Sequence, residues 1–377
     1  MSQVKRIYIP CFEKDSKKKA LVITGPRQCG KTTAANMLTG TKEYFNYDLQ
    51  EDRDIITQKS WNRTTDYIIF DELHKMPGWK QFIKGLIDTE SNNPSLIITG
   101  STCLYTYKKF GESLAGRYFE YRMHPLDVRE ICLMDDSADP DFVFDKILRF
   151  SGFPEPFIEA DERFYNKWKK THLDIIIKQD IVSYESVRNI ASIELLVDLL
   201  RKKVGSPISY ISLAEDLKVS DKTVKHWLNI LEEMFIIFKI TPYHRNIARA
   251  VQKKPKYYFY DCMRVASGDG AKIENAVASS LFKECQFRED CLGETWQINY
   301  LSKRGGVEVD FLITKEGVPH TMIEVKKSDD SLSKNFSSFT ELLPDVQIVQ
   351  LVKDLRKEKT YPSGAMVRRA GSWLAKW

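Results

Sequence analysis

The feature that most constrains this chain is a glycine-containing segment that directly follows a short apolar run. The apolar run extends from Ala20 to Thr24, and the segment GPRQCGKTT extends from Gly25 to Thr33. It matches G-x-x-x-x-G-K-[ST], in which a buried strand leads into a loop whose backbone N–H groups surround phosphate oxygens. A helix is expected to follow the loop. The sequence therefore predicts an α/β domain with a phosphate-binding loop. The alternative is a chance match in a glycine turn.

Every residue of this loop is expected to contact a bound nucleotide, either ATP or ADP. Lys31 is expected to neutralise phosphate charge, and the Thr32 hydroxyl is expected to ligate Mg²⁺. The predicted nucleotide-binding residues are Gly25, Pro26, Arg27, Gln28, Cys29, Gly30, Lys31, Thr32 and Thr33.

A second apolar run, from Tyr67 to Phe70, ends in two carboxylates, Asp71 and Glu72. We expect Asp71 to hold Mg²⁺, directly or through water. Glu72 is expected to act as the general base that polarises the water attacking the γ-phosphate. An acidic pair at the end of a strand is a weak signal by itself, but together with the loop it predicts an ATPase site.

Further polar groups follow a third apolar run, Leu96 to Ile98. Thr99 or Ser101 is expected to hydrogen-bond the attacking water or a phosphate oxygen; the alternative is a turn or N-cap hydroxyl. Arg117 is expected to stabilise the transferred phosphate, within the chain or in a neighbouring subunit of a homo-oligomer. The alternative for Arg117 is a surface or ion-paired arginine.

The overall composition is that of a globular protein with several domains. The chain has 377 residues, of which 42% are hydrophobic and 29% are charged. No apolar run reaches the length of a membrane span, and the N-terminus lacks the apolar core of a signal peptide. No two of the seven cysteines stand in C-x-x-C spacing. We therefore expect a cytoplasmic protein that does not insert into membranes.

The middle of the chain predicts a pair of helices followed by a strand. Residues 212–218 form a short amphipathic pattern, Ser220 is a plausible N-cap, and residues 221–234 form a longer helical pattern. The strand-like residues 235–240 complete a winged helix-turn-helix. In a DNA-reading role the open face of the second helix would use Lys222, Lys225, His226 and Asn229. The alternative is a winged helix used for packing. The net charge of +5 is compatible with either reading.

The C-terminal region contains a second group of residues suited to chemistry. Asp310 lies on one predicted strand, while Glu324 and Lys326 are two residues apart on the next and so share a face. Carboxylates that converge across a hairpin can bind Mg²⁺ or Mn²⁺, and an adjacent lysine can orient water. Glu274, on a preceding helix, would complete the site. The alternative is a hairpin with solvated charges on its outer face.

Together these motifs resemble the prokaryotic AAA-family ATPases that carry a C-terminal DUF4143 domain. The order of the motifs covers nearly the whole chain. Two positions depart from the pattern, because Cys29 and His74 stand where small apolar and glutamine residues are common. The motifs that carry the resemblance are GPRQCGKTT, Phe70 to Trp79, Ile98 to Ser101, Leu114 to Arg117, Pro125-Leu126, Trp168 to Asp174, Gln179 to Ile181, Tyr260-Asp261, Glu308 to Phe311 and Ile323 to Lys326.

The resemblance implies a C-terminal domain similar to PD-(D/E)xK nucleases, with Asp310, Glu324 and Lys326 as its site and Glu274 as a supporting acid. The expected fold class is α/β: a parallel-sheet P-loop domain, a helical and winged-helix segment, then a restriction-endonuclease-like domain. The expected domain ranges are 1–135, 136–204, 205–250 and 251–377. One functional hypothesis is ATP turnover coupled to cleavage of DNA or RNA. The alternative is an ATP-dependent switch whose nuclease-like domain only binds nucleic acid or a protein.

Overall fold

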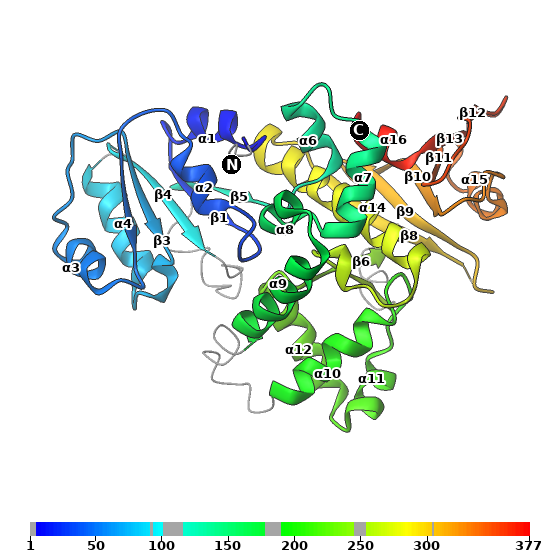
Figure 1. Cartoon of the computed structure of the whole chain (residues 1–377), viewed down its shortest axis with the longest axis horizontal. Helices are drawn as coiled ribbons and strands as arrows, with labels where there is room; N and C mark the ends of the chain where they lie inside the picture. The colour runs from blue at the N-terminus through cyan, green and yellow to red at the C-terminus, as the bar shows by residue number, and fades with distance from the viewer. Residues whose placement is uncertain (1–4, 91–92, 101–115, 178–189, 245–253, 304) are drawn as a thin grey trace. The chain divides into compact units, whose positions relative to one another are not determined.

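The chain forms two compact units in the computed structural model, which describes residues 5–90, 93–100, 116–177, 190–244, 254–303 and 305–377 (Figure 1). Unit 1 comprises residues 1–125 with the short segments 233–235 and 290–292. Unit 2 comprises residues 126–232, 236–289 and 293–377.

Unit 1 is built on a five-stranded sheet in the order β2-β3-β4-β1-β5, in which every neighbouring pair is parallel. The three apolar runs of the sequence form its central strands, which are buried on both faces as parallel strands require. The strands are β1 (Ala20–Thr24), β2 (Lys42–Asn46), β3 (Tyr67–Asp71), β4 (Ser95–Gly100) and β5 (Tyr118–Arg122).

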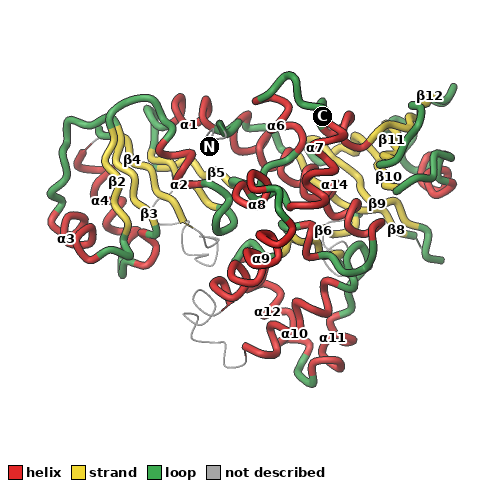
Figure 2. Tube along the Cα trace, viewed as in Figure 1, coloured by secondary structure: helices red, strands yellow, loops and turns green. Residues whose placement is uncertain are grey.

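Helices accompany this sheet along the chain (Figure 2). Buried aromatic side chains fill the core between them: Phe70 makes edge-to-face contacts with Trp61 and Phe82, with ring centroids 5.5 and 6.3 Å apart. The helices are α1 (Ile9–Asp15), α2 (Lys31–Asn36), α3 (Gln50–Gln58) and α4 (Trp79–Glu90), with a short 3₁₀ helix η1 (Leu73–Lys75).

The register of the parallel sheet gathers polar residues at one edge. Asp71 pairs with Thr99, and Thr24, the last residue of β1, pairs with Gly100. Because the carboxyl ends of parallel strands meet at the same edge, the loop that follows β1 and the acidic pair that follows β3 lie together there. This edge is where the predicted nucleotide site is built.

Unit 2 combines a helical part with a mixed sheet of eight strands in the order β12-β13-β11-β10-β9-β8-β6-β7. The hairpin β9–β10 and its neighbour β8 are antiparallel, whereas β11 pairs with β10 in parallel. The strands are β6 (Ile237–Pro242), β7 (Lys256–Phe259), β8 (Trp296–Ser302), β9 (Glu308–Lys315), β10 (Val318–Lys326), β11 (Gln347–Val352), β12 (Lys359–Thr360) and β13 (Met366–Arg369).

The long helix α14 lies against this sheet and packs on β8 and β10 (Figure 1). None of the helices in the described ranges is long and apolar enough to cross a membrane. The helices of unit 2 are α6 (Val128–Met134), α7 (Pro140–Phe150), α8 (Pro154–Glu159), α9 (Glu162–Ile175), α10 (Ile190–Arg201), α11 (Tyr210–Leu217), α12 (Asp221–Glu233), α14 (Asp269–Phe287), α15 (Ser337–Thr340) and α16 (Ala370–Leu374).

This architecture confirms the predicted fold class of a parallel α/β domain, a helical middle and a mixed α/β sheet. In the predicted helix pair, α11 and α12, the Ser220 Oγ accepts a hydrogen bond from the Thr223 N–H at 3.1 Å. The strand after α12 is β6, which belongs to the eight-stranded sheet rather than to a separate wing. The open face of α12 is exposed and carries the four predicted polar residues Lys222, Lys225, His226 and Asn229.

Candidate functional site

The loop between β1 and α2 has a backbone that requires glycine at both of its motif positions. Gly25 has φ 147° and Gly30 has φ 94°, a region that side chains with a Cβ disfavour. At Gly25 a Cβ would also lie only 2.1 Å from the Met123 carbonyl oxygen. The backbone of this segment therefore requires glycine at both positions, and α2 begins directly after Gly30.

Two buried side chains fix the far end of this loop. Arg6 donates from Nη1 to the Cys29 carbonyl and from Nη2 to the His124 carbonyl, both at 2.5 Å. The Cys29 thiol is fully buried and lies 3.7 Å from the Met123 carbonyl oxygen. Cys29 therefore turns its side chain into the protein, which leaves its backbone as the part that could face a nucleotide.

Lys31 lies over the beginning of the same loop. Its Nζ donates to the carbonyl oxygens of Gly25 at 2.9 Å and Pro26 at 2.8 Å. The side chain is almost fully buried. A buried ammonium group whose contacts in the described part of the chain are to neutral carbonyls is suited to pairing with an anion that enters the loop.

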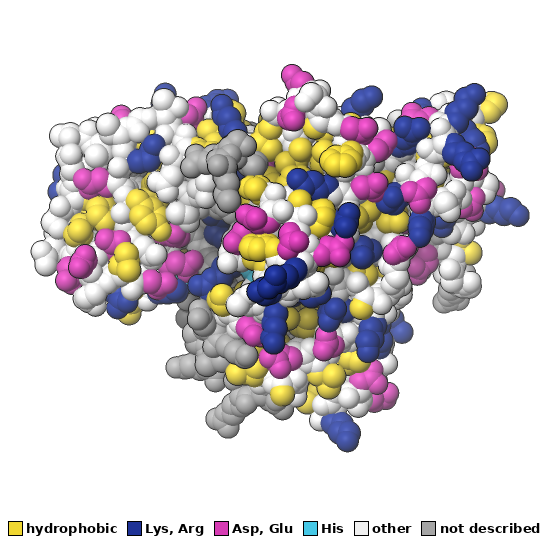
Figure 3. Space-filling model, viewed as in Figure 1, with side chains coloured by type: hydrophobic (Ala, Val, Ile, Leu, Met, Phe, Trp, Pro, Cys, Tyr) yellow, Lys and Arg dark blue, Asp and Glu magenta, His cyan; other side chains and the backbone are white. Residues whose placement is uncertain are grey.

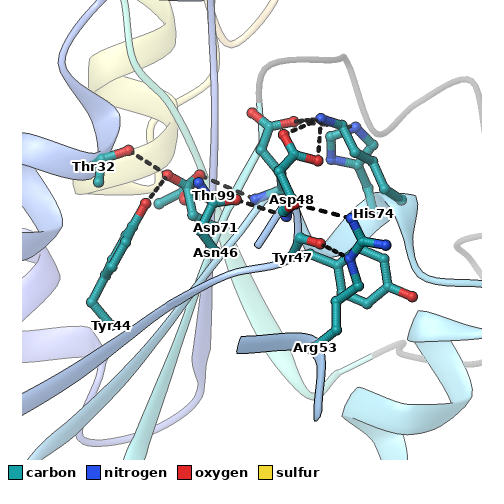
Figure 4. Close-up of polar contacts among 11 residues, drawn as sticks. Thr32, Tyr44, Asn46, Tyr47, Asp48, Arg53, Asp71, His74 and Thr99 are labelled. Atoms are coloured by element: carbon teal, nitrogen blue, oxygen red, sulfur yellow. Dashed lines mark hydrogen bonds and ion pairs between the residues drawn. The ribbon is translucent and has the colours of Figure 1, made fainter. Parts of the chain in front are cut away.

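Asp71 is the centre of the site, because three hydroxyl groups donate to its carboxylate (Figure 4). Oδ2 accepts from Thr32 Oγ1 and from the Tyr44 hydroxyl, each at 2.8 Å. Oδ1 accepts from Thr99 Oγ1 at 2.5 Å and from the Glu72 N–H at 3.1 Å. The residues that the sequence assigned to Mg²⁺ thus place two oxygens side by side.

These oxygen donors fit Mg²⁺, which is usually held by one or two protein oxygens together with substrate phosphates and water. Burial raises the pKa of the Tyr44 hydroxyl, and its hydrogen bond to Asp71 and the negative charge there raise it further. Tyr44 therefore remains a protonated donor to Asp71 at neutral pH.

Glu72 follows β3 in a left-handed backbone conformation, with φ 54° and ψ 23°. Its N–H donates to the Thr99 carbonyl oxygen at 3.1 Å, which ties the turn to β4. Its Oε2 lies 3.6 Å from both His74 Nε2 and Lys75 Nζ. Left-handed non-glycine residues are uncommon and tend to occur at functional sites.

His74 lies beside this acid with 11% of its side chain exposed. Burial lowers the pKa of its imidazole and outweighs the opposing effect of the Glu72 charge. Its Nδ1 has no hydrogen-bond partner among the described residues, and a Cβ added at Gly100 would lie 3.3 Å from it. His74 is therefore neutral at pH 7 and packs against the end of β4.

One predicted residue of the described ranges, Arg117, is not brought to this edge. Arg117 precedes β5, and Tyr118 pairs with Ala20 at the start of β1, so Arg117 lies at the amino-terminal edge of the sheet. There its Nε donates to Asp88 Oδ1 at 2.8 Å. Ser101 lies outside the described residues, and the hydroxyl that contacts Asp71 is that of Thr99.

Sequence reasoning missed three residues of unit 1: Tyr44, Arg6 and Asp48. Asp48 forms an ion pair with Lys75, with Nζ 2.6 Å from Oδ2. Tyr44 and Asp48 lie on or just after the edge strand β2, whose sequence has no motif. For Arg6 the only signal was a basic pair near the N-terminus.

The predicted acids of unit 2 converge across the β9–β10 hairpin and α14. Asp310 Oδ2 accepts from the Val325 N–H at 2.8 Å, and Lys326 Nζ donates to Glu324 Oε1 at 2.8 Å. Glu274 Oε1 accepts from the Tyr258 hydroxyl at 2.7 Å. The Oε2 of Glu324 is buried and has no hydrogen-bond partner within the described ranges.

The electrostatics show that these acids affect one another. Burial raises the pKa of Asp310 well above its ordinary value, and the charges of Glu274 and Glu324 raise it further. Burial likewise raises the pKa of Glu274, with Lys256 opposing it. For Lys326, burial lowers the pKa, but Glu324 and Asp310 outweigh this and the net shift is upward.

The sequence also missed two charged residues of this site, Lys256 and Glu308. Glu274, Glu308, Asp310 and Glu324 are called the acid cluster below. Lys256 is 2% exposed, and its Nζ lies 3.1 Å from Glu308 Oε2 and 4.9 Å from the centre of the Tyr300 ring. Within the described ranges, no three or more His, Cys, Asp or Glu side chains are arranged to hold a metal ion. Lys256 pairs with Glu308 and Lys326 pairs with Glu324, so these two lysines balance part of the negative charge of the acid cluster.

Charge on the surface is mixed rather than concentrated. On the face shown in Figure 3, Lys and Arg side chains are interspersed with Asp and Glu. The net charge of +5 is therefore not gathered into a single positive patch on that face.

Comparison with protein families agrees with this organisation. Residues 17–132 match a family described as an AAA domain, residues 142–263 match the domain of unknown function DUF8612, and residues 269–370 match DUF4143. The chain carries an AAA domain followed by a DUF4143 domain. The phosphate-binding loop, Asp71 and Thr99 all lie within the AAA match, and the acids of unit 2 from Glu274 to Glu324 lie within the DUF4143 match.

Similar proteins occur in distant organisms. An uncharacterized protein of Methanocaldococcus jannaschii is 24% identical over 76% of this chain and 67% of its own length. An uncharacterized protein of Haemophilus influenzae is 25% identical over 78% of this chain and 79% of its own length. A signal transduction ATPase with numerous domains and a tetratricopeptide repeat sensor, from Pyrococcus horikoshii, is 12% identical with a TM-score of 0.23. It is matched over 72% of this chain and 44% of its own.

Proposed function

We propose that unit 1 binds ATP with Mg²⁺ and hydrolyses it. The observation that carries the proposal is the Asp71 carboxylate, whose Oδ2 lies 2.8 Å from Thr32 Oγ1 beside the phosphate-binding loop. In this proposal the loop backbone and Lys31 hold the phosphates, and Thr32 and Asp71 hold Mg²⁺. Thr99 fixes Asp71, and Glu72 accepts the proton of the attacking water.

The AAA domain match supports this assignment, as do the two glycines that the loop backbone requires. When bound, Mg²⁺ would neutralise charge on the β- and γ-phosphates. Catalysis would otherwise come from positioning, because phosphoryl transfer requires little covalent chemistry from the protein.

Phosphate release with Mg²⁺ and ATP tests the proposal. Lys31→Ala is expected to lose ATP binding, whereas Glu72→Gln is expected to bind ATP with turnover reduced by about two orders of magnitude or more. Glu51→Gln, an exposed acid at the start of α3, is the matched control and should hydrolyse ATP like the wild type. Unchanged turnover in Glu72→Gln would remove Glu72 from the base role.

For Arg117 we propose a role only toward a neighbouring subunit. Its position at the amino-terminal edge, paired with Asp88, separates it from the loop of its own chain. Mixing Lys31→Ala and Arg117→Ala proteins should restore ATP turnover if one subunit supplies Arg117 to the next. Light scattering with and without ATP checks for the assembly, and a monomer in both states would contradict this role.

For unit 2 we propose that the C-terminal nuclease-like domain, residues 251–377, binds nucleic acid or a protein partner under the control of ATP in unit 1. The pairs Lys256–Glu308 and Lys326–Glu324 support a role without cleavage, because these lysines already balance part of the negative charge that a metal ion would otherwise neutralise. Metal-dependent cleavage is the second candidate. It is supported by Glu324, whose buried Oε2 is suited to a Mg²⁺ or Mn²⁺ ligand.

Incubation with plasmid, single-stranded DNA and RNA in Mg²⁺ or Mn²⁺ separates the two candidates for unit 2. Cleavage by wild type that Asp310→Ala abolishes would establish a nuclease. Asp345→Ala, which removes an exposed acid of unit 2, is the control. Binding of nucleic acid in a gel shift without cleavage would support the binding role. If nucleic acid is neither bound nor cleaved, the binding role is restricted to a protein partner.

A further inference from the structure

Two cysteines that are far apart in the sequence lie side by side in unit 1. Cys11 is on α1, and Cys291 is in the short segment 290–292, which belongs to unit 1 although the residues before and after it belong to unit 2. The two thiols form a side-chain hydrogen bond with each other. Both are free cysteines, and both are partly exposed. The pair is therefore within reach of a dissolved oxidant.

Segment 290–292 is held in this place by the Asp290 carboxylate. Oδ2 accepts from the Arg122 backbone N–H at 2.8 Å, and Oδ1 accepts from Arg122 Nη2 at 2.6 Å. The Asp290 side chain is only 7% exposed, so dissolved ions screen this pair much less than a surface pair. Cys291 directly follows Asp290 and is thereby fixed beside β5.

Helix α1 contacts the residue that precedes Arg122 in β5. The Tyr121 hydroxyl donates to Asp15 Oδ2 at 2.6 Å. The Tyr121 ring also packs edge-to-face on Phe12, with ring centroids 4.8 Å apart. Phe12 directly follows Cys11 in the sequence. Consecutive residues of β5 thus hold the two segments that carry the cysteines, and this keeps the thiols in contact.

The two thiols differ chemically. The hydrogen bond with Cys291 lowers the pKa of Cys11, and this effect outweighs burial, which raises it. The same hydrogen bond raises the pKa of Cys291, and burial raises it further. Because the thiolate is the attacking form of cysteine, Cys11 is suited to attack an oxidant first and Cys291 to react second.

We propose that Cys11 and Cys291 are a redox-sensitive pair that forms a reversible disulfide and so locks segment 290–292 onto α1. With a small disulfide as the oxidant, the Cys11 thiolate attacks one of its sulfur atoms, forms a mixed disulfide and releases one thiolate. Cys291 then loses its proton and attacks the Cys11 sulfur, which releases the second thiolate. The two protein thiols thereby lose two electrons and two protons, and the small disulfide is reduced to two thiols.

Oxidation of the whole chain with glutathione disulfide tests the proposal. After the remaining thiols are blocked, peptide mapping should yield one peptide pair linked through Cys11 and Cys291. Labelling of both thiols by N-ethylmaleimide should fall by about tenfold or more on oxidation and return with dithiothreitol. A wild type without the linked pair, or one in which Cys11 ends as a mixed disulfide with glutathione, would overturn the proposal.

Two variants test the order of the reaction. Cys291→Ser removes the second thiol, so oxidation should stop at the mixed disulfide on Cys11. Cys132→Ser is the matched control, because Cys132 is also partly exposed but burial raises its pKa. This control should form the link between Cys11 and Cys291 like the wild type. A link that is lost in Cys132→Ser would contradict the assignment of the pair.

Hydrogen exchange measures whether the disulfide locks the segment. In oxidised wild type the amides of residues 290–292 should exchange at least about threefold more slowly than in the reduced protein, whereas those of α4 should not change. Oxidised Cys291→Ser has no link and should exchange like reduced protein. Equal exchange in oxidised and reduced wild type would overturn the lock. Neither readout requires ATP, so both are independent of the proposed ATPase function.

Discussion

The hydroxyl of Tyr44 donates to Asp71 Oδ2 at 2.8 Å, the same oxygen and the same distance as the Thr32 hydroxyl. Tyr44 comes from the edge strand β2, whereas Thr32 comes from the helix after the phosphate-binding loop. The edge strand thus helps to set the orientation of the carboxylate that is proposed to hold Mg²⁺.

Removing this hydroxyl should therefore weaken the metal site. Tyr44→Phe loses one hydrogen bond to a charged group, which contributes about 1.5–3 kcal/mol at most and less at this partly exposed position. We expect the Mg²⁺ concentration for half-maximal ATP turnover to rise by about three- to tenfold. Titration of phosphate release with Mg²⁺ measures this. Tyr47→Phe, on the same segment, should show no such shift, because the Tyr47 ring packs on Arg53.

The two hydrogen bonds that Arg6 donates should control the shape of the phosphate-binding loop. Arg6→Met leaves two buried carbonyls, those of Cys29 and His124, without these donors. We expect unit 1 to lose about 2–4 kcal/mol of unfolding free energy and the KM for ATP to rise. Denaturant unfolding and steady-state kinetics check both. Lys5→Met, at the exposed neighbouring position, should change neither. Equal effects from the two variants would show that the Arg6 hydrogen bonds do not control the loop.

The sequence predicted the parts of unit 1 that depend on local pattern. Apolar runs identified β1, β3 and β4, and glycine spacing identified the loop. Since parallel strands must place their carboxyl ends together, the meeting of Thr32, Asp71 and Thr99 could also be expected. Tyr44 and Asp48 could not, because their roles depend on which strand lies beside β3.

Position along the chain was also a poor guide to where Arg117 lies. Arg117 follows the phosphate site closely in sequence, yet the parallel pairing of β5 with β1 puts it at the opposite edge of the sheet. In unit 2, the two-residue alternation along one strand predicted that Glu324 and Lys326 share a face, and in the structure they form an ion pair. Lys256 was missed because β7 reads as an ordinary buried strand in which a single lysine has no motif.

The acids of unit 2 should make its stability fall as pH rises. Burial, together with the charges of neighbouring acids, raises the pKa of Asp310 and Glu274 in the folded state. An acid whose folded pKa is raised contributes full stability below its unfolded pKa, near 4, and this is lost as pH rises through the folded pKa. Each unit of upward shift corresponds to about 1.4 kcal/mol.

Asp310→Asn removes one of these titrations and keeps an oxygen that can accept from the Val325 N–H. We expect it to unfold at higher denaturant concentration than wild type at pH 8 and to show a smaller difference near pH 4. Denaturant unfolding followed at several pH values gives the comparison. A variant less stable than wild type at pH 8 would show that the Asp310 carboxylate is held ionised by a favourable partner.

Lys256 should supply most of the positive charge that balances the buried acids of unit 2. Its Nζ contacts Glu308 at 3.1 Å, and its charge lowers the pKa of both Glu274 and Asp310 against the effect of burial. Lys256→Met leaves several buried acids without this cation, so we expect a loss of about 3–5 kcal/mol at neutral pH. Because the remaining acids can neutralise themselves by taking up protons, the loss should shrink as pH is lowered toward 5.

A cycle with Glu308→Gln tests whether the destabilisation comes from charge. The double variant Lys256→Met/Glu308→Gln should recover part of the lost unfolding free energy, since it removes the acid nearest to the missing lysine. Lys239→Met is the matched control, as it breaks the exposed pair with Glu232 and should cost less than about 1 kcal/mol. Added Mn²⁺ should stabilise Lys256→Met more than wild type if a cation can replace the lysine. Equal stabilisation of Lys256→Met and wild type by Mn²⁺ would mean that the acids do not bind the metal ion together.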